Sequence, residues 1–291
     1  MAVHMNDSFY ILELFSGHGS VSSIMGRIIG CQVETLDMDP RSEASMCVNI
    51  LDWGQEHADD LRERHGTRRP IIFASPPCEH YSRARTTSPR DLTLADKRVA
   101  MVERIARELD ACAVIMENPV GLLAGRDVAR FLGHIYTVDY CQYGALYRKP
   151  THLWSSVGLP PVFAPRECPL DGRCQAMVRD VAAGRWVHVD RVAGNAYEDK
   201  IRIPDQLVVC FTRGLLPHLI EWATMRSRDG EYEVEEIIDA REDDAGTREV
   251  LIRWKGYAIP GWTPFENLYQ PITGYDFAST EVRGRVLAWG A

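Results

Sequence analysis

The sequence lacks the features that mark membrane-spanning or secreted proteins. No uninterrupted run of about 18 apolar residues occurs in the chain, and the amino terminus lacks the layout of a signal peptide. The eight cysteines are spread through apolar segments rather than set in a regular framework. We therefore expect a soluble, intracellular protein with mostly reduced thiols and no membrane partner.

The sequence also lacks the excess of positive charge that proteins coating nucleic acid usually carry. The formal net charge is −8, and residues 230–270 hold ten acids against four bases. Bases nevertheless cluster twice in the first half, from Arg62 to Arg69 and from Arg83 to Arg90. The second cluster predicts local contacts with phosphate groups. The first is equally typical of an ordinary solvated surface.

Hydrophobic residues make up 45% of the 291-residue chain, which is enough to bury a sizeable core. Apolar runs alternate with helix-like segments over the first part, and this alternation predicts a doubly wound α/β sheet. Strands are expected at residues 9–15, 32–36, 48–52, 71–74, 111–116, 134–140 and 151–155. Helices are expected at residues 20–29 and 92–109, from Pro204 to Trp222, and in a polar segment ending near Arg64.

The most informative stretch is the apolar run at residues 71–74 followed by Ser75-Pro76-Pro77-Cys78. The prolines end the strand, because proline fixes φ and cannot donate to a ladder. Cys78 therefore lies at the carboxyl end of a strand, where open α/β sheets bind their ligands. A cysteine there can be a nucleophile if positive charge or a helix amino terminus favours the thiolate. Alone, such a cysteine is more often structural.

Other strand ends carry residues suited to chemistry. The turn from Phe15 to Gly19 joins a strand to a helix, as in folds that bring a backbone close to a nucleotide, although its spacing is not the dinucleotide fingerprint. Asp37 ends the second strand, where a carboxylate can bond ribose hydroxyls. Glu117 ends the strand at 111–116 and is the second chemically important position.

The chain contains a series of stretches that resemble, in this order, the motifs of the cytosine-C5 DNA methyltransferase family. They are residues 15–19, 37, 76–78, 117–119 and 142–144. The resemblance covers roughly residues 9–156, with a weaker match at 203–216. It implies a class I S-adenosylmethionine-dependent methyltransferase fold, which is a Rossmann-like doubly wound sheet. The cofactor site implied by the resemblance consists of Phe15, Ser16, Gly17, Gly19, Asp37, Met38, Asn49 and Pro76. In it, Asp37 would hold the ribose and Met38 would pack on the adenine.

The resemblance also implies a covalent mechanism. Cys78 would add to C6 of cytosine and so make C5 nucleophilic, while a protonated Glu117 would donate to N3. Lys149 stands where the family has an arginine that positions the base, and lysine keeps the charge without the bidentate fork. The target base must leave the duplex, so base flipping is implied. The expected DNA contacts are Ser82, Arg83 and Arg85.

Residues 157–202 occupy the place of the family's target recognition region. They number only forty-six, so we expect short or relaxed sequence specificity. Within this region, Cys168 and Cys174, with His188 beyond them, have loose zinc-ligand spacing. No fourth ligand is evident in the sequence, and no metal site is predicted.

Residues 231–239, 251–257 and 262–268 are expected to form three short strands, and they resemble a chromodomain. That family is a small β-rich domain with a carboxy-terminal helix, expected here within 271–289. Its methyl-lysine cage maps onto Tyr232, Trp254 and Tyr257, aromatic residues suited to cation–π binding of a quaternary ammonium. The alternative is that these rings pack the small barrel. The expected domains are 1–228 for the methyltransferase and 229–291 for the chromodomain.

Together the two resemblances predict a DNA (cytosine-5-)-methyltransferase that uses S-adenosylmethionine. Its chromodomain would bind methylated histone tails and direct the enzyme to chromatin in the nucleus. The pairing is similar to that of chromomethylases in a different domain order, and the compact catalytic part is similar to phage-type enzymes. Two alternatives stay open. One is an RNA cytosine-C5 methyltransferase, and the other is a non-catalytic chromatin reader, against which intact Cys78 and Glu117 argue.

Overall fold

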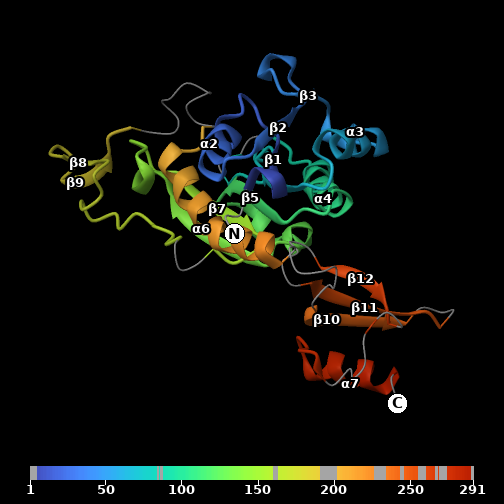
Figure 1. Ribbon diagram of the computed structural model, residues 1–291. Coiled ribbons are helices and arrows are strands. Elements are labelled where there is room, and N and C mark those ends of the chain that lie inside the picture. Colours follow the sequence, from blue (N-terminus) through green and yellow to red (C-terminus); the bar gives the residue numbers. More distant parts are fainter. Residues whose placement is uncertain are drawn as a thin grey trace.

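The computed structural model describes residues 5–83, 85, 88–159, 163–190, 202–225, 234–242, 246–254, 260–265, 268 and 274–289. Strands in these ranges form a seven-stranded sheet, a three-stranded sheet and a two-stranded hairpin (Figure 1). None of the helices in the described ranges is both long and apolar enough to cross a membrane.

The large sheet has the strand order β3-β2-β1-β4-β5-β7-β6. Its strands are β1 Phe9–Leu14, β2 Gln32–Asp37, β3 Met46–Cys47, β4 Arg69–Ala74, β5 Ala113–Pro119, β6 His134–Asp139 and β7 Pro150–Ser155. The first five run parallel, and β7 is antiparallel to both of its neighbours. The order reverses between β1 and β4, so the carboxyl ends of these strands flank a topological switch point, where such sheets bind ligands.

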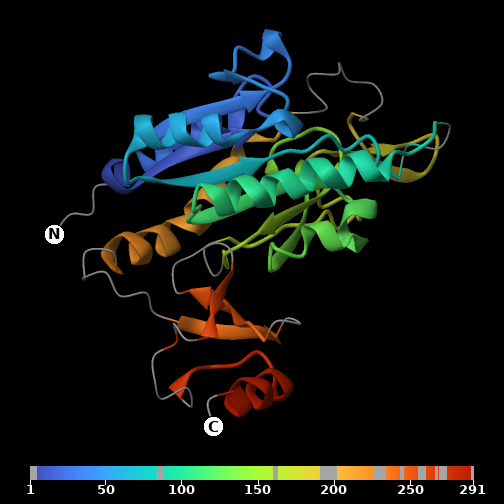
Figure 2. The same ribbon diagram turned by 90° about the vertical axis from the view of Figure 1, so that its right-hand side faces the viewer.

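Two helix layers cover this sheet. Helices α2 Ser20–Ile29 and α6 Asp205–Met225 pack on one face, and α3 Gln55–His65 and α4 Leu92–Glu108 pack on the other. Figure 2 shows α4 in green and α6 in orange running alongside the strands. Alternate residues of β1 enter the two cores: Phe9 and Ile11 face α2 and α6, whereas Tyr10 and Leu12 face α3 and α4. Burial on both faces explains why the strands are continuous apolar runs.

Shorter elements join the strands. Helix α1 is Met5–Ser8, and the 3-10 turns are η1 Pro40–Ser42, η2 Ile50–Asp52, η3 Leu122–Gly125, η4 Asp127–Ala129 and η5 Tyr140–Tyr143. The predicted α/β sheet is confirmed, but the expected third strand at 48–52 is wrong. The strand is Met46–Cys47, and Asn49 caps the turn that follows by accepting a hydrogen bond from the Leu51 N–H at 3.1 Å. An asparagine side chain that bonds its own backbone favours such a turn over a strand.

Helix α6 lies where the sequence predicts, against the first strand. Its Trp222 ring contacts the Phe9 ring with centroids 5.1 Å apart, and Phe211 stacks on Phe73 of β4 at 5.6 Å. Pro204 precedes the helix, which suits a residue with no N–H to donate. Arg202 and Ile203, just before it, reach the carboxyl end of the sheet.

A hairpin of β8 Met177–Asp180 and β9 Arg185–His188 lies within the expected target recognition region. No strand was predicted there from the sequence. Its tight turn includes Gly184 with φ 64°, a left-handed conformation that favours glycine.

The carboxy-terminal part has a separate core. Strands β10 Val234–Glu242, β11 Arg248–Trp254 and β12 Gly261–Pro264 form an antiparallel sheet that lies apart from the large sheet in Figure 1. Helix α7 Thr280–Trp289 covers it, with Val282 and Val286 packed against Ile237 and Ile252. Three strands followed by a helix match the prediction, and the helix at Thr280–Trp289 lies within the expected range 271–289.

Candidate active site

A cleft of about 680 Å³ opens at the carboxyl ends of β1, β2, β4 and β5. It brings together ten of the eleven residues expected to bind cofactor or act in catalysis: Phe15, Ser16, Gly17, Asp37, Met38, Asn49, Pro76, Cys78, Glu117 and Lys149. The eleventh, Gly19, is the residue before α2. Residues that are far apart in the sequence therefore share one site, because parallel strands end at the same edge of the sheet.

The turn after β1 has an unusual backbone. Phe15 has φ 58°, Gly17 has φ 50° and Gly19 has φ 66°, and only glycine adopts the left-handed region without strain. The N–H of Gly17 donates to Asp37 Oδ2 at 2.8 Å, and Asp37 Oδ1 accepts from the Asp39 N–H at 2.8 Å. These bonds fix the Asp37 carboxylate at the cleft, with lone pairs remaining for hydroxyl donors.

Met38 and Asn49 form another part of the cleft wall. The side chain of Met38 is 61% exposed beside Asp37 and offers an apolar surface to a planar ligand. Asn49 uses its Oδ1 to accept from the Leu51 N–H, so its amide NH2 is the part that can donate to a ligand.

Glu13 also lines the cleft, although it is not among the residues predicted from the sequence. Its side chain is almost wholly buried in β1 and accepts a hydrogen bond from the Ser22 N–H, in the first turn of α2, at 2.8 Å. Burial raises the pKa of Glu13 to about 7. The sequence does contain a sign of this role, because Glu13 is an acidic residue inside the apolar run 9–15. An acid in such a run is typical of a buried carboxylate with a functional role.

The loop that carries Cys78 is tied to the end of β5. Asn118 Nδ2 donates to the carbonyl oxygen of Pro76 at 2.7 Å, and both groups are buried. The Cys78 carbonyl oxygen accepts from the N–H groups of Tyr81 and Ser82 at 3.0 and 2.8 Å. The Pro-Pro-Cys segment is therefore held from both sides.

Gly121 completes this arrangement through close packing. A Cβ on Gly121 would lie 2.4 Å from the carbonyl oxygen of Tyr81, a distance that no real Cβ contact shows. The N–H of Leu122 donates to the same oxygen at 2.9 Å. The segments that follow β4 and β5 thus contact each other directly, and only glycine permits the approach.

Glu117 lies beside Tyr140 and Lys149. The Tyr140 hydroxyl donates to Glu117 Oε1 at 2.8 Å, and Lys149 Nζ is 3.7 Å from the same oxygen. Lys149 Nζ also lies 4.6 Å from the centre of the Tyr140 ring, which is within cation–π range. Tyr140 is not among the predicted site residues, since nothing in the alternating run 134–140 distinguishes it from a core aromatic.

The electrostatics of Cys78 follow from these neighbours. Burial raises the pKa of the Cys78 thiol, the charge on Glu117 raises it further, and Lys149 lowers it. The expected positive charge near the thiol is therefore present as Lys149, but burial outweighs it. Contacts made by a bound substrate must favour the thiolate for Cys78 to act as a nucleophile.

The residues expected to contact DNA lie beside the cleft and not in its lining. Ser82 forms an isolated bridge with Gly121, and Arg83 is exposed. Arg85 is half-buried and donates from Nε to the Pro89 carbonyl at 3.1 Å. Arg90, in the same basic cluster, donates to the carbonyl oxygens of Ser82 and Arg85 at 2.7 and 2.6 Å. Arg90 therefore holds this loop together.

The earlier basic cluster has a structural role. On α3, Arg62 pairs with Asp59 at 2.8 Å, and Arg64 pairs with Asp60 at 2.7 Å. Arg64 also contacts the buried Glu34 of β2 at 2.6 Å. The two pairs within α3 follow the i,i+3 and i,i+4 spacing of helix surfaces, so phosphate contacts are not needed to explain Arg62 and Arg64.

Comparison with known proteins identifies the family. No protein-family model matches the chain. A Frog virus 3 (isolate Goorha) protein named "Probable DNA (cytosine-5)-methyltransferase" is 30% identical over 197 residues, which cover 62% of this chain and 84% of the viral protein. The chain belongs to the DNA (cytosine-5)-methyltransferase family. Enzymes of this family use S-adenosylmethionine.

Two solved structures show partial similarity to this family member. An E. coli protein described as a "putative DNA modification methyltransferase encoded within prophage" has a TM-score of 0.42 and 18% sequence identity, and the match covers 55% of this chain and 51% of that one. A triple mutant of DNMT2 from Spodoptera frugiperda has a TM-score of 0.35 and 17% identity, with 51% and 49% covered. The chain thus spans about half the length of each.

The cleft of this methyltransferase-family chain suits S-adenosylmethionine. Asp37 offers a carboxylate to a ribose diol, and Met38 offers an apolar face to a base. Gly17 faces open space, since a Cβ there would meet no atom within 4 Å. Glu13 places a buried carboxylate where a cationic ligand would stabilise its charge.

Two further sets of predicted residues lie away from the cleft. Tyr232 and Tyr257 are outside the described residues, whereas Trp254 is half-buried and packs against the core of the small sheet. Cys168, Cys174 and His188 lie together, and Cys141 joins them as a fourth side chain. Cys141 was not predicted, because it lies outside the region that contains the other three.

Proposed function

We propose that this protein transfers a methyl group from S-adenosylmethionine to C5 of cytosine in DNA. The observation that carries the proposal is the position of Cys78 and Glu117 at the ends of the adjacent parallel strands β4 and β5, in one cleft with Asp37. Family membership supports the reaction class.

The residues proposed to hold the cofactor are those at the ends of β1 and β2. Asp37 would accept hydrogen bonds from the ribose hydroxyls, Met38 would pack on the adenine, and the Asn49 amide would meet the edge of the adenine. Phe15 and Gly17 would contact the methionine part. When bound, S-adenosylmethionine supplies an electrophilic methyl group.

The proposed nucleophile is Cys78. Its thiolate would form a bond to C6 of cytosine, and the electron pair of the C5–C6 double bond would make C5 nucleophilic. Glu117 would donate a proton to N3 and so stabilise the adduct. After methyl transfer, a base would remove the C5 proton, the double bond would re-form, N3 would return its proton to Glu117 and Cys78 would leave as a thiolate.

Lys149 and Tyr140 have supporting parts in this proposal. Both contact Glu117 Oε1, so they would hold the carboxyl group in position against N3. Lys149 also favours the thiolate form of Cys78. The target cytosine would reach the cleft by leaving the duplex, with Ser82, Arg83 and Arg85 on the loop that follows Cys78 contacting the strand.

We further propose that residues 229–291 act as a chromodomain. Support comes from the order of three antiparallel strands and a helix. Trp254 would contribute to a cage for a methylated lysine of a histone tail, and this would direct the enzyme to chromatin in the nucleus. Trp254→Ala should then weaken the binding of a trimethyl-lysine histone peptide and leave activity on naked DNA unchanged. Equal losses in both assays would instead indicate a packing role.

Covalent trapping tests the catalytic proposal. The protein, S-adenosylmethionine and duplex DNA containing 5-fluorocytosine are incubated, and a denaturation-resistant complex is sought on a gel. Fluorine cannot leave C5 as a proton does, so a working enzyme stalls with Cys78 bonded to C6. Cys78→Ala should abolish the complex, whereas Cys47→Ala, which changes an exposed cysteine, should retain it.

The alternative functions are outcomes of the same assay. A complex that forms with 5-fluorocytosine in tRNA but not in duplex DNA would refute a DNA substrate and support RNA methylation. No complex with either nucleic acid, together with no heat of S-adenosylmethionine binding in calorimetry, would refute catalysis and support a non-catalytic reader.

A further inference from the structure

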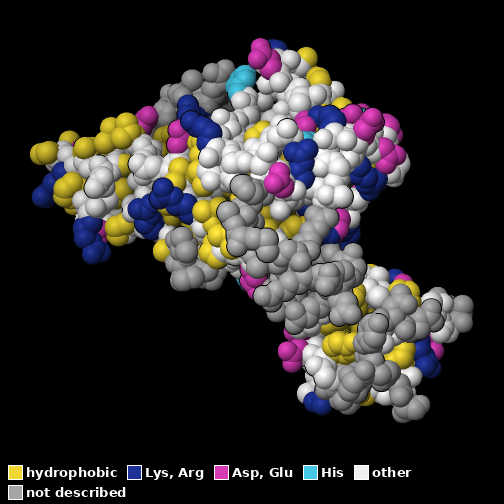
Figure 3. Space-filling view, viewed as in Figure 1, with side chains coloured by type: hydrophobic (Ala, Val, Ile, Leu, Met, Phe, Trp, Pro, Cys, Tyr) yellow, Lys and Arg dark blue, Asp and Glu magenta, His cyan; other side chains and the backbone are white. Residues whose placement is uncertain are grey.

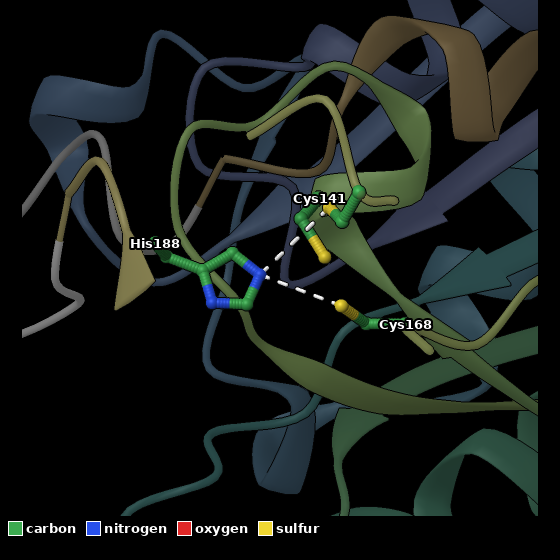
Figure 4. Close-up of side chains that lie close together, drawn as sticks. Cys141, Cys168 and His188 are labelled. Atoms are coloured by element: carbon green, nitrogen blue, oxygen red, sulfur yellow. Dashed lines mark hydrogen bonds between the residues drawn. The ribbon is translucent and has the colours of Figure 1, made fainter. Parts of the chain in front are cut away.

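Four metal-ligating side chains meet outside the active site. The sulfur atoms of Cys141, Cys168 and Cys174 and a ring nitrogen of His188 all lie within 4.8 Å of one another. Figure 4 shows the His188 ring pointing toward the sulfur atoms of Cys141 and Cys168. All three cysteines are buried free thiols, each at most 7% exposed.

The distances in this cluster match a tetrahedral zinc site. With Zn–S bonds of about 2.3 Å and Zn–N bonds of about 2.0 Å, a tetrahedron places sulfur and nitrogen ligands roughly 3.5 Å apart. The observed distances from His188 Nε2 are 3.5 Å to Cys168 Sγ and 3.9 Å to Cys174 Sγ. Three thiols and one imidazole are also a common ligand set of closed structural zinc sites.

The polypeptide around the cluster positions these ligands. The Cys168 N–H donates to Asp139 Oδ2 at 2.8 Å, and Asp139 is fully buried and paired with Arg148 at 3.0 Å. Gly172 lies between Cys168 and Cys174 in the chain and has φ 84°. A Cβ at this position would lie 2.3 Å from the ring of Trp186 on β9. The loop that carries both cysteines therefore lies flat against the hairpin that carries His188.

This segment has little else to hold it. Among the residues that the structure describes, its buried cluster consists of the three cysteines with Ala176 and Met177. The larger apolar side chains of the hairpin are exposed instead, and yellow side chains gather over β8 and β9 in Figure 3. They are Val178, Val181, Trp186 and Val189, with exposed fractions from 44 to 87%. A module with so small a core needs a cross-link to keep one conformation.

We propose that Cys141, Cys168, Cys174 and His188 bind one Zn²⁺ ion in a structural site. Zinc binding displaces the three thiol protons, and four protein ligands leave no open position for catalysis. Cys141 lies in η5 directly after β6, whereas His188 ends β9. The ion therefore joins the hairpin of the expected target recognition region to the edge of the catalytic sheet.

Metal content tests the proposal without any activity assay. The full chain is produced with zinc in the medium, purified without chelator and measured by plasma mass spectrometry, and one zinc per chain is expected. Cys141→Ser, Cys174→Ser and His188→Ala each remove a ligand, so each should weaken zinc affinity by more than the roughly 10- to 100-fold that loss of an outer-shell contact costs. Cys31→Ser and Cys47→Ser change cysteines outside the cluster, and both should keep the zinc.

X-ray absorption of the wild-type protein tests the zinc site even if the ligand variants fail to fold. It should give three sulfur neighbours at about 2.3 Å and one nitrogen at about 2.0 Å. Cobalt substitution should give the visible bands of a tetrahedral site with thiolate charge transfer. A chain that holds no zinc would refute the site, and so would zinc that persists in all three ligand variants. Peptide mass spectrometry that finds a disulfide between two of the cluster cysteines would refute it as well.

Discussion

The buried carboxyl group of Glu13 provides a quantitative test of the structure. It is only 3% exposed, and the bond from the Ser22 N–H does not offset its loss of solvation. Glu13→Gln keeps the shape of the side chain and an oxygen for that N–H, but removes the charge. We therefore expect this substitution to change how stability depends on pH more than it changes the fold.

The direction in which stability changes with pH follows from the pKa of Glu13, which rises from 4.5 to about 7 on folding. The folded state binds the proton more tightly, so the protonated form favours folding, and stability is lost as pH rises between the two values. Each tenfold difference in proton affinity between the folded and unfolded states corresponds to about 1.4 kcal/mol. From about pH 5 to about pH 8.5, the wild type should lose about 2.5 kcal/mol relative to Glu13→Gln.

The assay is urea or thermal unfolding of both proteins across this pH range. A change of about 2.5 kcal/mol in relative stability corresponds to a change of roughly 5–10 °C in the difference between the two melting temperatures. Glu63→Gln removes an exposed carboxylate of α3 and serves as the control, with no comparable trend expected. A difference between wild type and Glu13→Gln that stays constant over the whole range would refute the raised pKa of Glu13.

Three further predictions concern Cys78 and the residues around it. Glu117→Gln removes a charge that raises the pKa of Cys78, and Lys149→Ala removes a charge that lowers it. At constant pH, iodoacetamide should therefore alkylate Cys78 faster in Glu117→Gln than in the wild type. It should alkylate Cys78 more slowly in Lys149→Ala. Glu117→Gln should also lower methyl transfer by about 100- to 1000-fold, as for loss of one transition-state hydrogen bond, and near wild-type turnover would contradict its role. Gly121→Ala forces a Cβ against the Tyr81 carbonyl and should lower activity by roughly 100-fold through displacement of the loop. Gly125→Ala, with open space around it, should not.

The main residues of the active site could be predicted because the position of each one follows from its immediate neighbours in the sequence. Cys78 follows an apolar run and two prolines, and Glu117 ends another apolar run, so each residue is assigned to a strand end by its own neighbours. A parallel sheet then brings the two ends together without further information. The same reasoning placed Asp37 correctly. It failed for the third strand, where the side chain of Asn49 competes with the ladder for backbone bonds.

Contacts between distant segments could not be predicted in this way. Tyr140 bonds Glu117 only because β7 pairs with β5 on one side and β6 on the other. Gly121 is required by one carbonyl oxygen that lies forty residues earlier in the chain. Cys141 is separated from Cys168 by a whole strand, so motif spacing does not connect them. Each of these residues has an ordinary sequence context and a role that exists only in the folded chain.

The turn η5 links the active site to the proposed zinc site. Tyr140 and Cys141 are consecutive in it, and one contacts Glu117 while the other contacts the cysteine and histidine cluster. A single peptide unit cannot move one of these side chains freely while the other is held. A metal ion at Cys141 would thus restrain the hairpin on one side and the Tyr140 hydroxyl on the other. This geometry gives a physical reason why the expected target recognition region can be so short: the catalytic sheet and a metal ion, and not a large core of its own, would fix its position.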